Sequence, residues 1–182
     1  MTRIFVVVFA ALTVVGLPSV VCAKGDVVRI VIEGQTLPKP LVITDPAIVD
    51  KFFIWFGPGA GQPMGSEASL QPGSVLDWHE GIVAERPNGM RSYDVFFYCT
   101  YDRSKPGDVL TYVVKYEYDP AAQRGYVHLP GQGAKNFGLN ASAVFHGVEG
   151  NWFYSSAEWE TLVRPFVDRA TSQDGGDLAA KR

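Results

Sequence analysis

The stretch RSYDVFFYCTY, residues 91–101, decides the fold together with VLTYVVKYEY, residues 109–118. In each stretch, aromatic and β-branched side chains recur at every second position, which is the period of a β-strand. Residues 102–108 between them contain Lys105-Pro106-Gly107, a turn sequence. Two strands joined by a short turn pair in an antiparallel sheet.

Further strands are expected on both sides of this pair. Apolar runs predict strands over 26–32, 41–43 and 126–129, and 142–146 is expected as an edge strand. The turn Pro87-Asn88-Gly89 predicts a hairpin that joins a strand over 81–86 to the strand over 91–101. The expected fold class is α+β: a single antiparallel β-meander sheet of about five to six strands, with two short helices packed on it.

The two helices have recognisable starts. Asp45-Pro46 supplies an N-cap and a first helical residue, and apolar side chains follow at helical spacing up to Phe53. Ser155 and Glu158 have the spacing of a capping box. The apolar stripe of the second helix consists of Trp159, Leu162, Val163, Phe166 and Val167. Pro165 lies inside this stripe, so we expect a kink there.

The N-terminus has the features of an export signal. Arg3 precedes the apolar run Ile4–Val15, which is short for a membrane span, and Ala23 is a suitable residue before a cleavage site. We expect residues 1–23 to be a cleaved signal peptide, 24–170 a single globular domain and 171–182 a flexible polar tail. The protein would then be secreted or periplasmic, and would meet the membrane only through the signal sequence during export. An uncleaved anchor and lipidation at Cys22 are the alternatives.

Composition excludes several classes of protein. Sixteen basic against nineteen acidic residues give a formal charge of −3, which argues against nucleic acid as a partner. Loss of residues 1–23 leaves Cys99 without a second cysteine, so no intramolecular disulfide is expected. Cys99 shares a strand face with Val95 and Phe97, which predicts a buried thiol rather than a nucleophile.

Motifs for catalysis are weak. The three histidines, His79, His128 and His146, are scattered and have no local metal-ligand spacing, and no motif calls for a cofactor. The glycine-rich loop 57–74 contains prolines and no Gly-Lys-Ser/Thr, which argues against a phosphate cradle. His79 and Glu80, with His128 brought close by folding, are the weak catalytic candidates for a small and possibly metal-assisted hydrolase.

Aromatic residues are the better candidates for a binding surface. Most tyrosines, including Tyr112 and Tyr116, share strand faces with valine and leucine and are expected in the core. Phe96 and Tyr98 lie on the opposite strand face and are candidates for a contact surface. The remaining candidates are near the glycine-containing loops, and the full binding set is Trp55, Trp78, Phe96, Tyr98, Asn136 and Phe137.

These patterns favour a non-catalytic binding or envelope interaction domain, with a glycan or a peptide as partner. The alternatives are the small hydrolase that uses His79 and Glu80, and a purely structural envelope component. Asn140-Ala141-Ser142 also fits a glycosylation acceptor, which matters only in a eukaryotic secretory host.

Overall fold

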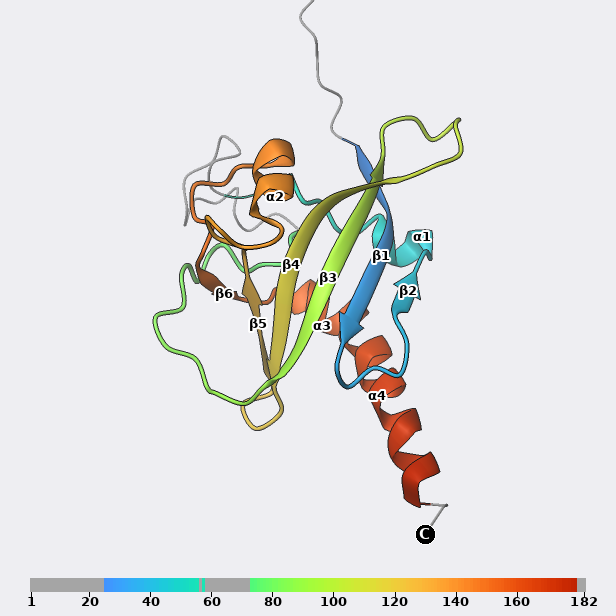
Figure 1. Cartoon of the computed structure of the whole chain (residues 1–182), viewed down its shortest axis with the longest axis vertical. Helices are drawn as coiled ribbons and strands as arrows, with labels where there is room; N and C mark the ends of the chain where they lie inside the picture. Colours follow the sequence, from blue (N-terminus) through green and yellow to red (C-terminus); the bar gives the residue numbers. More distant parts are fainter. Residues whose placement is uncertain (1–24, 56, 58–72, 180–182) are drawn as a thin grey trace, which may run out of the picture.

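The computed structural model describes residues 25–55, 57 and 73–179. The expected signal peptide with Cys22, and most of the loop 57–74, lie outside these residues. Within them the chain forms six strands and four helices (Figure 1). In chain order they are β1 (Asp26–Gly34), β2 (Leu41–Ile43), α1 (Pro46–Val49), β3 (Arg91–Thr100), β4 (Val109–Asp119), β5 (Arg124–His128), α2 (Phe137–Ala143), β6 (Trp152–Tyr154), α3 (Ala157–Leu162) and α4 (Arg164–Ala179).

The strands form one sheet in the order β2-β1-β3-β4-β5-β6, with every neighbouring pair antiparallel. The expected α+β class with a meander sheet is therefore confirmed. β3 and β4 form the longest ladder, from Arg91 opposite Tyr118 to Cys99 opposite Val109. These are the two stretches whose alternation predicted the sheet.

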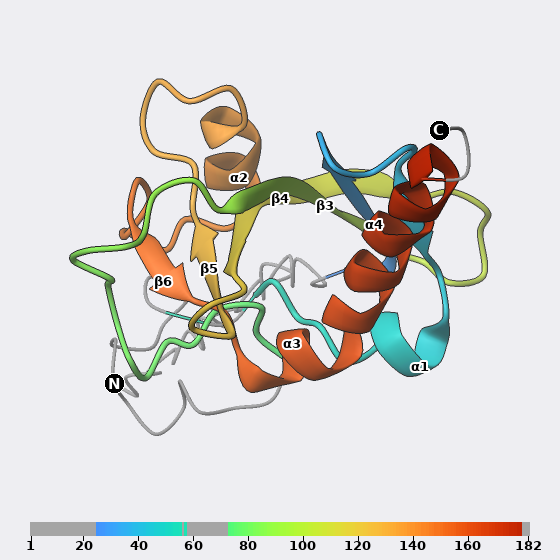
Figure 2. The ribbon, with the colours of Figure 1, turned by 90° about the horizontal axis from the view of Figure 1, so that it is seen from below.

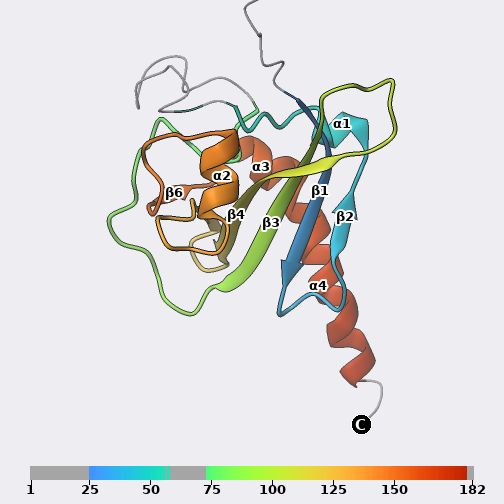
Figure 3. The same ribbon diagram turned by 45° about the horizontal axis from the view of Figure 1, so that its top comes forward.

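The sheet separates the helices into two layers. Figures 2 and 3 show α2 on one side of the sheet and α3 and α4 on the other. We call the side of α3 and α4 the core face and the side of α2 the outer face. The core face carries Tyr93, Val95 and Phe97 of β3, all of them buried.

Trp159 of α3 is the centre of the core. Its side chain has no exposed surface, and its ring centroid lies 5.4 Å from that of Phe52, 5.6 Å from Tyr116 and 6.3 Å from Phe97. Edge-to-face and tilted packing of this kind adds to the stabilisation from burial alone. The prediction that Tyr93, Tyr112 and Tyr116 belong to the core is confirmed, since each exposes at most 3% of its surface.

The expected hairpin through Asn88-Gly89 does not form. The segment 81–86 has only an isolated bridge, between Ile82 and Phe153 of β6, and the Val83 N–H donates to the Trp152 carbonyl. β3 already pairs with β1 on one edge and β4 on the other, so it has no edge left for a hairpin partner. Residues 76–83 instead cover the outer edge of β6.

The expected edge strand over 142–146 is also wrong. Residues 137–143 form α2, Val144 ends it in an extended conformation, and the last strand of the sheet is β6. The helix was missed because its sequence, Phe-Gly-Leu-Asn-Ala-Ser-Ala, has neither a capping signal nor an apolar stripe of helical period.

Asn140 explains why α2 lies where it does. Its side chain accepts a hydrogen bond from the Val113 N–H (2.9 Å) and donates one to the Val113 carbonyl (2.6 Å). β5 pairs with β4 only up to His128 opposite Lys115. Two residues further, this register would place Pro130 opposite Val113, and proline has no N–H to donate. The Asn140 amide thus supplies both bonds that a β5 residue would have made.

The remaining helix boundaries differ slightly from expectation. Asp45 caps α1 by accepting from the Ala47 N–H, but the helix ends at Val49. Ser156, not Ser155, caps α3 by accepting from the Trp159 N–H. α3 and α4 meet at Val163, close to the kink expected from Pro165. α4 continues to Ala179, through most of the segment expected as a polar tail.

Candidate functional site

Polar side chains form a continuous row across the outer face. The strand registers place Glu33 (β1) opposite Asp94 (β3), Asp94 opposite Lys115 (β4), and Lys115 opposite His128 (β5). Trp152 of β6 completes the row opposite His128. Directly opposite side chains on one sheet face lie within contact distance, so these groups act on one another.

A groove opens at the β1 end of this row. Its volume is about 680 Å³, within the range of small-ligand sites. The lining is largely polar and comes from the β1–β2 connection, the turn before β3, and the outer faces of β3 and β4. We call it the polar groove, and it consists of Glu33, Gly34, Gln35, Thr36, Gly89, Met90, Arg91, Ser92, Asp94 and Lys115.

Lys115 fixes the wall of the polar groove. Its ammonium lies 3.3 Å from the Asp94 carboxylate and 3.4 Å from the Ser92 hydroxyl. Both bonds cross from β4 to β3, so the rigid ladder between these strands holds the three groups in place. A ligand in the groove would therefore meet preorganised acceptors and donors.

Beyond the groove, arginines cover the aromatic rings of the outer face. The Arg86 guanidinium lies 3.9 Å from the centre of the Trp152 ring and bonds to Glu117. Arg29 lies 3.6 Å from the Tyr98 ring centre and makes two 2.7 Å bonds to Asp108. Each ring is thus covered by a cation that a carboxylate neutralises, and its face is not open for stacking a ligand.

Arg124 repeats this arrangement. Its guanidinium lies 3.2 Å from the centre of the Tyr154 ring and bonds to Glu80. Glu80, one of the sequence-predicted catalytic candidates, is therefore neutralised by an arginine. Tyr154 in turn packs against Tyr126, with ring centroids 5.4 Å apart.

The structure separates His79 from the functions expected for it. His79 is exposed, and its printed hydrogen bond is from its backbone N–H to Asp77. His128 is half-buried on β5, with its ring 4.9 Å from that of Trp152. Burial lowers the pKa of His128, and the charges of Lys115 and Arg86 lower it further, while a backbone hydrogen bond with Gly150 opposes the shift. In residues 25–55, 57 and 73–179, no three histidine, cysteine or acidic side chains gather as a metal site.

Two of the predicted binding tryptophans have structural roles. Trp78 is buried, with 1% of its surface exposed, and packs against Phe153 and His146. It is therefore not a surface contact residue. Trp55 is half-buried, and its indole N–H donates to the Gly25 carbonyl at 2.8 Å, which ties it to the start of β1.

The other predicted binding residues are half-buried on the outer-face side. Phe96 lies on β3 between Val31 and Val113, and Tyr98 lies under Arg29. Asn136 and Phe137 are at the start of α2, not in a loop as expected. The structure does not gather these four residues with Trp55 and Trp78 into one surface.

Two further sequence predictions have clear outcomes. Cys99 is fully buried, and this burial raises the pKa of its thiol, as expected for a structural cysteine. Asn140 is fully buried and both ends of its amide bond to Val113, so the folded chain offers no acceptor for a glycan there.

Sequence reasoning missed the polar groove. Glu33, Asp94 and Lys115 each stand on a strand whose alternation is visible, but they come from three strands. Only the register, which depends on bulges between Val27 and Arg29 and between Phe97 and Tyr98, places them in one row.

Comparisons of this chain with protein-family models, curated proteins and solved structures found no match. In the described part of the chain, none of the helices has the length and apolar character that crossing a bilayer requires.

Proposed function

We propose that this protein is an exported, non-catalytic binding domain whose polar groove takes a glycan. The observation that carries the proposal is the groove itself: about 680 Å³ on the outer face, with a preorganised wall at Lys115, Asp94 and Ser92. Export rests on the signal-like segment 1–23, with a secreted or periplasmic location as its consequence.

The lining favours a glycan over a peptide. Hydroxyl groups of a sugar donate and accept hydrogen bonds at short intervals, and the groove offers both kinds of partner. Carboxylates of Glu33 and Asp94 accept, the Lys115 ammonium donates, and Thr36, Ser92 and Gln35 do both. An apolar peptide side chain would find no matching apolar pocket in this lining.

The hydrolase alternative has less support. Its acid, Glu80, is bonded to Arg124, and its base, His79, is exposed with no carboxylate contact printed for its ring. The arginine would hold the Glu80 carboxylate in its charged form and away from a substrate.

Titration of the purified protein with a panel of soluble glycans, followed by NMR chemical shifts, tests the proposal. We expect shifts at Ser92, Asp94 and Lys115, and a loss of affinity of tenfold or more in Asp94→Asn, because hydrogen bonds to charged groups contribute about 1.5–3 kcal/mol. Glu85→Gln is the matched control, since Glu85 is exposed and lies outside the groove.

Failure has a clear form in both parts. If the panel moves no groove resonance, or if Glu85→Gln weakens binding as much as Asp94→Asn, the groove is not the site. N-terminal sequencing of exported material is expected to begin at Lys24, and a start at Met1 contradicts cleavage after Ala23.

A further inference from the structure

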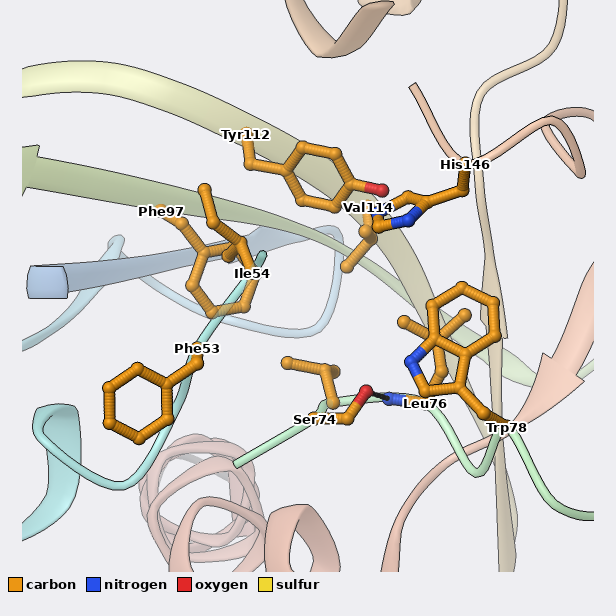
Figure 4. A pocket seen from close by; sticks show the side chains of 10 residues that line it. Phe53, Ile54, Ser74, Leu76, Trp78, Phe97, Tyr112, Val114 and His146 are labelled. Carbon is orange, nitrogen blue, oxygen red and sulfur yellow. Dashed lines mark hydrogen bonds between the residues drawn. The ribbon is translucent and has the colours of Figure 1, made fainter. Parts of the chain in front are cut away.

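A small closed cavity lies on the core face, apart from the polar groove. Its volume is about 10 Å³, and its walls come from residues 53–54, 74–76, β3, β4 and the segment after α2 (Figure 4). Most of the lining is apolar. The polar groups with side chains in the lining belong to Ser74, Trp78, Tyr112 and His146.

Two of these groups are buried polar atoms without a hydrogen-bond partner. They are the indole nitrogen of Trp78 and the hydroxyl of Tyr112. Trp78 exposes 1% of its surface and Tyr112 3%, so water outside the protein does not reach them. Leaving such a group unpaired costs about 1–3 kcal/mol, and buried polar groups in folded proteins almost always have a partner.

Both groups keep a proton to donate. The indole nitrogen is a donor only, and a phenol both donates and accepts. Burial raises the pKa of Tyr112, and the nearby charge of Glu149 raises it further, so the phenol stays protonated. A partner must therefore accept from Trp78 and exchange a hydrogen bond with Tyr112.

We propose that this cavity binds one internal water molecule, which accepts a hydrogen bond from the Trp78 indole and bonds to the Tyr112 hydroxyl. A cavity of 10–15 Å³ measured with a water-sized probe holds about one water, and a buried water needs two to four polar partners. The size and the chemistry of the cavity fit this occupant, and a larger ligand does not fit.

The location gives the water a structural role. Tyr112 belongs to β4, and Trp78 to the segment that covers β6. The His146 ring packs against both, with centroids 5.2 Å from Trp78 and 5.9 Å from Tyr112 (Figure 4). The water would join three segments that have no strand pairing with one another at this point.

Two NMR measurements on the purified protein test this site. Oxygen-17 magnetic relaxation dispersion counts long-lived internal waters, and rotating-frame cross-relaxation detects a bound water next to the Trp78 indole N–H. We expect a cross-peak at Trp78 and none at Trp159. The Trp159 indole is equally buried and unpartnered but does not line this cavity, which makes it the internal control.

The variant Tyr112→Phe is expected to lower the count of long-lived waters by one and to remove the Trp78 cross-peak. Tyr93→Phe is the matched control, because the buried Tyr93 hydroxyl accepts from Thr36 and lies outside the cavity. The proposal is wrong if the wild-type protein shows no cross-peak at Trp78, or shows an equal one at Trp159. If Tyr112→Phe does not fold, the wild-type comparison of the two indoles decides alone.

Discussion

The two faces of the sheet use aromatic residues differently. On the core face, rings pack against rings, as in the cluster of Trp159 with Phe52, Phe97 and Tyr116. On the outer face, arginines cover the rings, and carboxylates neutralise the arginines, as in Arg86 between Trp152 and Glu117. An aromatic residue on the solvent side of a strand is therefore not by itself a binding platform, and the ligand-sized space on this face is polar.

The largest expected effect comes from removing the centre of the core face. Trp159→Ala should lower the free energy of unfolding by about 3–5 kcal/mol, because a fully buried ring leaves a cavity. Trp152→Ala removes the same side chain from under Arg86, where it is half-buried, and should cost about 1–2 kcal/mol. Urea unfolding measures both, and equal losses would contradict the distinction between the faces.

The next effect concerns the part of the outer face that α2 covers. Asn140→Ala leaves the Val113 N–H and carbonyl unpaired, so we expect a loss of about 2–3 kcal/mol of stability. Ser142→Ala lies on the same helix, is exposed and bonds only locally, and should change stability by less than about 0.5 kcal/mol. Thermal or urea unfolding of the pair separates the amide's role from general effects on the helix.

A smaller effect is expected where an arginine covers a ring. Arg86→Gln removes the cation from Trp152 and leaves Glu117, 8% exposed, without its charged partner. We expect a loss of about 1.5 kcal/mol. Lys105→Gln breaks the pair with Asp102, whose lysine side chain is 78% exposed, and should have no measurable effect on urea unfolding.

The smallest effect is a pH dependence on the outer face. The pKa of His128 in the folded protein lies below its ordinary value near 6.5, chiefly because of burial. The unfolded chain therefore binds a proton first as pH falls. Stability should be full above the ordinary value and decrease as pH falls through 6.5 toward the folded-state pKa, and His128→Gln should remove this part of the decrease. Histidine NMR titration with urea unfolding at several pH values measures it, and a folded-state pKa above 6.5 would contradict the assignment.

The sequence predicts the parts of the fold that depend on local pattern. Alternation over 91–101 and 109–118 identified β3 and β4 and the residues that face the core, and the apolar stripe at Trp159 identified the helix that covers them. Asp45-Pro46 identified the start of α1. Each of these signals is contained in one segment, so no knowledge of distant partners was needed.

The rest depended on which segments meet. Asn88-Gly89 is a strong hairpin signal, but β1 and β4 occupy both edges of β3, and this competition between strands is invisible in a local window. Trp78 resembles a surface residue in sequence because polar residues surround it, although folding buries it against Phe153. The polar groove joins side chains from three strands through their register, which bulges shift by one residue.

The bond between Asn140 and Val113 also bears on how the protein avoids self-association. A strand with free backbone groups along its edge can pair with another molecule and start an aggregate. Where Pro130 ends the pairing of β5, a side-chain amide closes the edge of β4 without offering a new one. The sheet is thus ended at this point by a group that cannot be extended, which protects a β-rich chain at high local concentration.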